Sequence, residues 1–130
     1  MMSSRNIVEE LDRGRLDRMQ IEQVVIGSAM SFEECWLKAN RILTGKVFSS
    51  SKNQFVWQIL ADMKREGMEP DPVSMWVYAC DKYPGMKNPC DLGVYICELG
   101  MVVCYADYDK FVSALLKSYN EERLKANGRK

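Results

Sequence analysis

Cysteine is the residue type in this 130-residue chain with the widest range of possible chemistry. The five cysteines are Cys35, Cys80, Cys90, Cys97 and Cys104. They form no C-x-x-C pair, and the chain has no histidine, so neither a zinc site nor a thiol redox motif is indicated. The lack of histidine also removes the commonest general base and excludes Ser-His or Cys-His catalysis. We therefore expect five structural cysteines, which pack as small apolar groups, and no bound metal.

The dipeptide Gly45-Lys46 resembles the end of a phosphate-binding loop. Such a loop needs a glycine five residues before the second glycine and a serine or threonine after the lysine. Here those positions hold Asn40 and Val47. The phosphate-loop interpretation therefore fails, and no cofactor is expected.

Acidic residues give the remaining enzymatic hypothesis, with Asp71, Glu98 and Asp107 as candidates. Asp71 and Asp107 are better explained as helix caps, and the sequence places no pair of these acids in a common pocket. We therefore expect no catalytic residue, and no enzymatic activity of this chain on its own.

Composition favours one globular domain, since 47% of the residues are hydrophobic and 28% are charged. Lysine plus arginine equals aspartate plus glutamate at 18 each, so bulk charge does not favour binding to nucleic acid. The stretch from Met1 to Asp12 has no apolar core of a signal peptide, and the sequence has no apolar run of transmembrane length. These features predict a cytoplasmic protein that does not enter a membrane, and they leave open a local patch that binds nucleic acid.

The segment 20–30 (Q-I-E-Q-V-V-I-G-S-A-M) is the expected central helix. Apolar residues cover most of its circumference, as in a helix that neighbours enclose on several sides. Gly27 inside it costs roughly 1 kcal/mol of helix propensity relative to alanine. We therefore expect a neighbouring helix to approach Gly27 closely.

Capping patterns predict about six helices in a compact orthogonal bundle of the all-α class. The expected helix starts are the S-x-x-E box at Ser31, a second box at Ser51, the pair Asp71-Pro72, Asp91 and Asp107. The segment 94–104 is rich in β-branched residues, so a strand is the rival interpretation. We favour a helix, because a single strand among helices would have no partner strand.

The chain is divided into a flexible N-terminal arm at 1–18, a single helical domain at 19–126 and a basic tail at 127–130. The arm is expected to be a frayed helix that orders against a partner, because it has few apolar residues to bury. The last helix carries an unbroken apolar stripe at Tyr108, Phe111, Val112, Leu115, Leu116 and Tyr119.

Several motifs together resemble the N-terminal domain of DnaB-type replicative DNA helicases. Glu22-Gln23 with Gly27 is similar to the E-Q-x-h-h-G signature of that family, where h is apolar. The other matching positions, in order along the chain, are Phe48, Val56-Trp57, the G-x-x-x-D-x-x-T-like set Gly67, Asp71 and Ser74, the Y-L-x-x-L-like segment Tyr95 to Leu99, Asp107 and Phe111. The resemblance runs from about residue 20 to residue 125.

The resemblance implies a non-catalytic helical scaffold. In replicative helicases such a domain forms the collar of a ring hexamer, receives primase or loader proteins, and pairs through a terminal helical hairpin. This sequence departs from the pattern at two places. The family has Gly-Gly at the positions of Asp91-Leu92, and the family has a Thr-Pro segment at the positions of 102–104. The sequence ends at Lys130 without a Walker A motor, so we expect no ATP hydrolysis or DNA unwinding by this chain alone.

Self-association through the last helix is the expectation that follows, because the resemblance implies a hairpin of which one arm is present. The candidate interaction residues are Tyr108, Phe111, Leu115 and Tyr119. The alternative is that this stripe is buried entirely within one chain.

A stand-alone helical regulatory or DNA-binding adaptor is the second functional hypothesis. In it, Arg13, Arg15 and Arg18 of the arm or the tail from Arg123 would contact phosphates, with affinity that falls steeply with salt. The sequence leaves open whether it is a whole gene product or part of a longer helicase.

Overall fold

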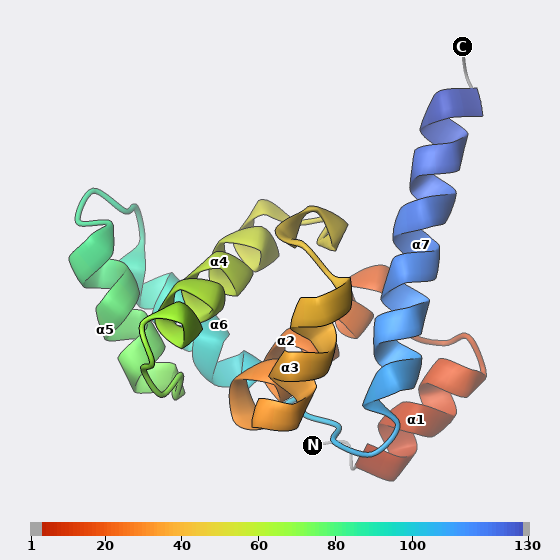
Figure 1. Cartoon of the computed structure of the whole chain (residues 1–130), viewed down its shortest axis with the longest axis horizontal. Coiled ribbons are helices and arrows are strands. Elements are labelled where there is room, and N and C mark those ends of the chain that lie inside the picture. Colours follow the sequence, from red (N-terminus) through yellow and green to blue (C-terminus); the bar gives the residue numbers. More distant parts are fainter. Residues whose placement is uncertain (1–3, 129–130) are drawn as a thin grey trace.

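α-Helices account for nearly all the regular structure of this protein. The computed structural model describes residues 4–128, and within these it contains seven α-helices, one 3-10 helix and no strand (Figure 1). The helices are α1 (Ser4–Asp12), α2 (Arg18–Ser31), α3 (Glu33–Ile42), η1 (Gly45–Val47), α4 (Ser51–Arg65), α5 (Pro72–Lys82), α6 (Pro89–Leu99) and α7 (Tyr108–Gly128). The all-α class is thus confirmed. The strand alternative for 94–104 is wrong, because α6 and a following turn occupy it.

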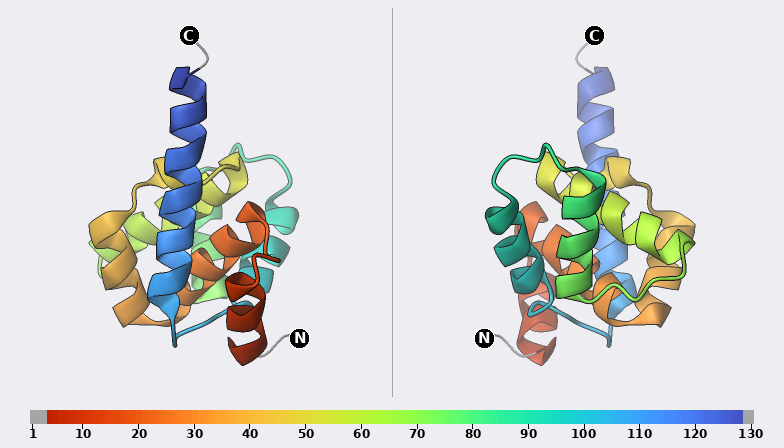
Figure 2. Two further views of the ribbon diagram at one scale, coloured as in Figure 1. Left: turned by 90° about the vertical axis from the view of Figure 1, so that its right-hand side faces the viewer. Right: turned by 90° about the vertical axis from the view of Figure 1, so that its left-hand side faces the viewer.

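The centre of the domain is α2, which packs against α3, α4, α6 and α7. Its residues from Val24 to Met30 are all buried, which confirms the expected central helix. Figure 2 shows the two ends of the molecule, with α7 in front at one end and α5 at the other. The core therefore lies between these two outer helices, around α2.

Gly27 is the point of closest approach in this core. A Cβ atom built on Gly27 would lie 2.1 Å from the carbonyl oxygen of Leu99 and 2.7 Å from that of Val102. Leu99 is the last residue of α6, so the expected close approach by a neighbouring helix is confirmed. Only a glycine allows α2 and the end of α6 to approach to this distance.

Two of the predicted helix starts are present in the structure. Asp71 caps α5 by accepting a hydrogen bond from the backbone N–H of Ser74 at 2.9 Å, and Pro72 follows as the first helical residue. The last helix begins directly after Asp107, as predicted. A capping box that the sequence analysis missed starts α2, where the carboxylate of Asp17 accepts from the backbone N–H of Gln20 at 2.8 Å.

Three other predicted caps are wrong. Ser31 is the last residue of α2, and its hydroxyl donates to the carbonyl oxygen of Gly27 at 3.0 Å, so it cannot start α3. The cap of α4 is Ser50, one residue before the predicted Ser51. Asp91 lies in the first turn of α6, which begins two residues earlier after Asn88 in a left-handed conformation.

The predicted N-terminal arm contains α1, which explains the helix beyond the expected six. Ile7 of α1 is buried in the hydrophobic core cluster, and the carboxylate of Asp12 lies 3.5 Å from the Nζ atom of Lys110. The arm therefore contacts the same domain, with residues 1–3 outside the described range. In the predicted basic tail, Asn127 and Gly128 belong to α7, and residues 129–130 lie outside the described range.

Candidate interaction surfaces

A buried carboxylate, Glu22, occupies the centre of the helicase-like signature on α2. Its side chain is fully buried. One carboxylate oxygen accepts from the side-chain amide of Asn53 at 2.8 Å, and the other accepts from the backbone N–H of Ser49 at 2.8 Å. A buried carboxylate needs such partners, because without them its desolvation would be strongly unfavourable. Glu22 thus joins α2 to the start of α4 and the segment before it.

Arg18 and Tyr95 extend this polar centre to other helices. The Nε atom of Arg18 lies 3.3 Å from the carboxylate of Glu22, and another guanidinium nitrogen donates to the carbonyl oxygen of Val47 at 2.8 Å. Arg18 also pairs with Glu122 of α7. The Tyr95 hydroxyl from α6 contacts the amide oxygen of Asn53, and burial is the main reason that its pKa lies above the ordinary value. The centre therefore connects α2, α4, α6 and α7 through structural contacts.

The acids considered for catalysis do not form a common site. Asp71 caps α5, Asp107 precedes α7 and is exposed, and Glu98 lines a groove between α5 and α6. Among the described residues, no group of three or more cysteine, aspartate or glutamate side chains could hold a metal ion. These positions therefore give no chemical mechanism.

The four predicted interaction residues of α7 divide into two groups. Tyr108, Phe111 and Leu115 are fully buried against the core of their own chain. The Tyr108 hydroxyl donates to the carbonyl oxygen of Val25 on α2 at 2.9 Å, and burial raises its pKa. Tyr119 is half-buried, and the guanidinium carbon of Arg123 lies 5.6 Å from the centre of its ring. Of the four, only Tyr119 is open to a partner without movement of α7.

The C-terminal end of α7 extends away from the rest of the domain (Figures 1 and 2). We call residues 120–128, all of which are exposed, the α7 end. Leu124 is 70% exposed there, the highest value among the large apolar side chains of the described residues. The predicted apolar stripe did not indicate Leu124, because this residue lies about 80° further round the helix than Leu116, beyond the edge of the stripe.

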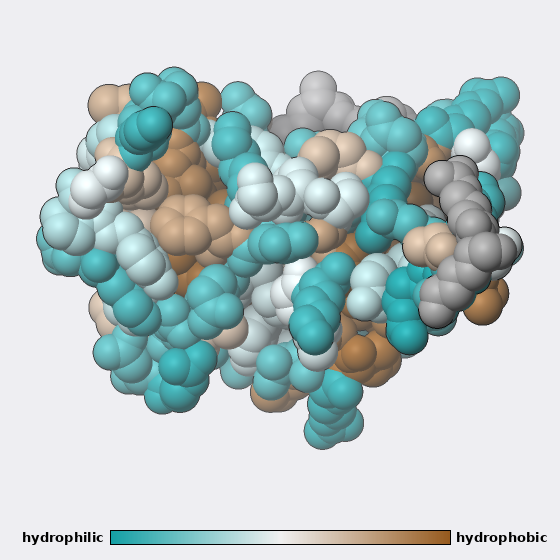
Figure 3. Space-filling model, turned by 90° about the horizontal axis from the view of Figure 1, so that it is seen from above, coloured by the Kyte–Doolittle hydropathy of each residue, from teal (hydrophilic) through white to brown (hydrophobic). Residues whose placement is uncertain are grey.

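A second apolar surface lies between α5 and α6, in a groove of about 410 Å³ that we call the α5–α6 groove. Its main lining residues are Val73, Trp76, Cys90, Val94, Cys97 and Met101. The same end of the molecule shows brown apolar atoms framed by teal hydrophilic side chains when seen from above, at the left of Figure 3.

The burial of the cysteines differs in part from the expectation. Cys35 and Cys104 are buried as expected, and burial raises the pKa of the Cys35 thiol to about 11. Cys90 and Cys97 are exposed, so the expectation of five packed cysteines is wrong for these two. The face of α6 that carries Ile96 is buried instead, which leaves both thiols on the outer side of the helix.

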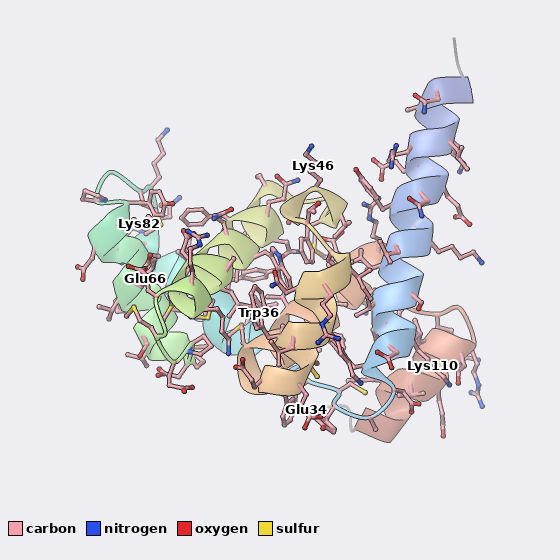
Figure 4. All side chains as sticks on the ribbon, viewed as in Figure 1. Glu34, Trp36, Lys46, Glu66, Lys82 and Lys110 are labelled. Carbon is pink, nitrogen blue, oxygen red and sulfur yellow. The ribbon has the colours of Figure 1, made fainter. Side chains whose placement is uncertain are left out.

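Asp62 is the centre of a group of ionic contacts between α4 and α5. Asp62 of α4 is buried, and its carboxylate accepts from the Nζ atom of Lys82 and from a guanidinium nitrogen of Arg65, each at 2.8 Å. Burial raises the pKa of Asp62, but hydrogen bonds from Lys82, Gln58 and Arg65 together outweigh it, so the pKa lies below the ordinary value. Figure 4 places Lys82 and Glu66 at the end of the molecule that carries α5.

The aromatic residue of the helicase-like Val56-Trp57 pair is part of the core. Trp57 is buried with its ring centre 5.1 Å from that of Trp36 and 5.1 Å from that of Phe48. Trp36 is seen between α3 and α4 in Figure 4. Both Phe48 and Trp57 therefore match the helicase pattern as packing residues.

The arginines proposed for phosphate contact are in part occupied by acids of the same chain. A guanidinium nitrogen of Arg15 lies 3.5 Å from the carboxylate of Glu10. Arg18 pairs with Glu22 and Glu122, as described above. These contacts reduce the positive charge that the arm would offer to nucleic acid.

Comparison with known protein families agrees with the motifs on α2, α4 and α5. A family model described as the DnaB-like helicase N terminal domain matches residues 15–87, which is more than half of the 130-residue chain. Searches of curated proteins and of solved structures found no match. No helix in the described range is long and apolar enough to cross a membrane. The chain belongs to the DnaB-like helicase N-terminal domain family.

Proposed function

We propose that this chain is a non-catalytic scaffold of a replicative DNA helicase, which associates with further copies of itself and receives primase or a helicase loader. Family membership supports a role in a replicative helicase. The observation that carries the proposal of self-association is the α7 end, which leaves the domain with Leu124 unpacked. A helix that is exposed in this way gains stability when an apolar partner surface covers it.

The proposed pairing surface is the α7 end around Leu124, and Tyr119 lies at its base on another side of the helix, about 140° away. Tyr108, Phe111 and Leu115 have a supporting role in this proposal, because they hold the first turns of α7 against the core. A rigid base of this kind reduces the ordering entropy that association must overcome. Four residues were expected to contact a partner, and the proposal retains Tyr119 for direct contact.

The proposed role is not enzymatic, since the matching family model describes the non-catalytic part of a helicase. Contact with DNA would be indirect, through the assembled helicase. The proposal includes a cytoplasmic location, the compartment in which we expect such a helicase to act.

Light scattering coupled to size-exclusion chromatography tests self-association. We expect the wild-type chain to form a dimer or a larger assembly as concentration rises, and a Leu124→Glu variant to remain monomeric. Val77→Glu is the matched control, because Val77 is 46% exposed on α5, at the opposite end of the molecule from α7, and should assemble like the wild type. A wild-type chain that is monomeric at all concentrations, or an L124E chain that assembles normally, would overturn the pairing.

A further inference from the structure

The α5–α6 groove combines exposed apolar side chains from both of its walls. Val73 of α5 is 65% exposed, whereas Val94 of α6 and Met101 after it are each 59% exposed. Scattered exposed apolar residues are common, but several around one groove indicate a binding surface. The groove is thus a candidate site beside α5, which lies at the opposite end of the molecule from α7.

The floor of this groove is fixed by Trp76. Its indole N–H donates to the carbonyl oxygen of Pro89 at 2.7 Å, which ties α5 to the start of α6. A Cβ atom on Gly93 would lie 3.1 Å from the indole nitrogen, so the absence of a side chain there lets the ring pack on the helix backbone. A large aromatic group in a fixed orientation is typical of interface hot spots.

The charged side chain in the lining of the groove is acidic. A neighbouring hollow that shares Val73 has balanced charges, because it is lined by Arg65 and Lys82, which pair with Asp62, and by Glu66 and Asp81.

Glu98 lines the groove, and a second adjoining hollow, which shares Pro72, is lined by Glu69 and Asp71. Neither the groove nor this second hollow has a lysine or arginine in its lining, although the whole chain has equal numbers of acids and bases. Within the described part of the chain, Glu69 and Glu98 form no ion pair. A partner with positive charge beside its apolar face would complement this surface.

We propose that the α5–α6 groove receives an amphipathic helix of a partner protein, with apolar anchors on one face and lysine or arginine beside them. This inference rests on the docking part of the proposed function and gives its surface and the chemistry of its partner. A groove between two helices fits a helix, as in other helix-in-groove complexes. The described residues contain no strand, so strand addition at a sheet edge is not available.

A synthetic helical peptide with leucines at i, i+4 and i+7 and flanking lysines tests the proposal. The readout is the indole N–H resonance of Trp76, with the buried Trp36 and Trp57 as internal references. We expect the peptide to shift the Trp76 resonance, and we expect the other two to stay in place. Absence of a Trp76 shift at saturating peptide would refute the docking site.

Variants identify the groove as the binding surface. Val94→Glu and Glu98→Lys should each weaken peptide binding roughly tenfold or more. Both positions are on the outer side of α6, so the fold should persist, which circular dichroism would check. Ile42→Glu should bind the peptide as the wild type does, because Ile42 is 55% exposed at the end of α3 and does not line the groove. Equal weakening by V94E and I42E would contradict the assignment of the groove.

The charge requirement has its own control. A peptide with the same leucines but glutamates in place of the lysines should bind more weakly, and the difference should shrink at high salt. Equal binding of the two peptides would refute a basic partner.

The oligomeric state separates this proposal from α7 pairing. V94E should assemble like the wild type, whereas L124E should lose assembly and keep peptide binding. The contrary outcome is that the peptide dissociates the wild-type assembly and that V94E also prevents assembly. A second copy of the chain would then occupy the groove, and the proposal of a foreign partner would be wrong.

Discussion

Helix propensity and packing predict opposite effects of Gly27→Ala on the stability of the protein. Helix propensity alone predicts that Gly27→Ala stabilises the protein by about 1 kcal/mol, because α2 would lose a flexible residue. The structure places the new methyl group 2.1 Å from the carbonyl oxygen of Leu99. An ordinary contact begins at 3.4 Å, so α2 and the end of α6 would have to separate by about 1.3 Å at that point.

The separation would disturb contacts on both sides of Gly27. The neighbouring Ser28 hydroxyl accepts from the backbone N–H of Cys104 at 2.8 Å, and the carbonyl oxygen of Val25 accepts from Tyr108. Both obstructing atoms belong to the backbone, so no side-chain rotation relieves the overlap. Overpacking costs typically 1–3 kcal/mol and occasionally more, and we expect a net loss of about 2 kcal/mol in the free energy of unfolding.

Urea and thermal unfolding followed by circular dichroism measure this loss. For a domain of this size, about 2 kcal/mol corresponds to a fall in Tm on the order of 10 °C. Gly128→Ala is the matched control, because Gly128 is also helical but has no atom within 4 Å of the position that a Cβ atom would take. A Gly27→Ala protein as stable as the wild type would refute the close-packing argument, and so would a Gly27→Leu protein that folds and assembles normally.

Three further predictions concern the core, the pH dependence of stability and the thiols. Phe111→Asp should abolish cooperative unfolding, because it places a charge at a fully buried position. The pKa of Asp62 is lower in the folded protein, so its contribution to stability is present above the ordinary aspartate pKa of about 3.9 and is lost as pH falls through the folded value. When the free energy of unfolding is measured across that pH range, it should fall less in Asp62→Asn than in the wild type. Cys90 and Cys97 should react with a thiol reagent in the native state, whereas Cys35 should react only on unfolding, and mass spectrometry would identify the labelled sites.

Local sequence patterns were sufficient where the physical cause is local. Asp71-Pro72 starts α5 because its cap and its first residue act within one turn. The apolar circumference of α2 and its interior Gly27 predicted a buried helix with a close neighbour, and both are present. The expected absence of a partner strand likewise favoured α6 as a helix.

Features that depend on distant residues could not be read from those patterns. Ser31 fits a capping box, but Phe32 takes the cap position of α3, where its ring lies 5.0 Å from that of Tyr105. Glu22 would be assigned to the surface by its charge, and its burial depends on Asn53, which is 31 residues away. The α5–α6 groove requires the relative placement of two helices, which hydrophobic periodicity does not specify.

The direction of the α7 end depends mainly on the packed base of that helix. Glu122 of the α7 end forms an ion pair with Arg18, and the Glu122 side chain is largely exposed. Exposed ion pairs contribute at most about 1 kcal/mol to stability. Burial of a single aromatic side chain such as Phe111 contributes about 1.5–3 kcal/mol, so the packed first turns dominate. Because Tyr108 bonds to Val25 of α2, the helix that carries the family signature also fixes the base of α7. The helix with the signature therefore sets where α7 leaves the domain, and in the proposed assembly it also sets where Leu124 would contact a partner.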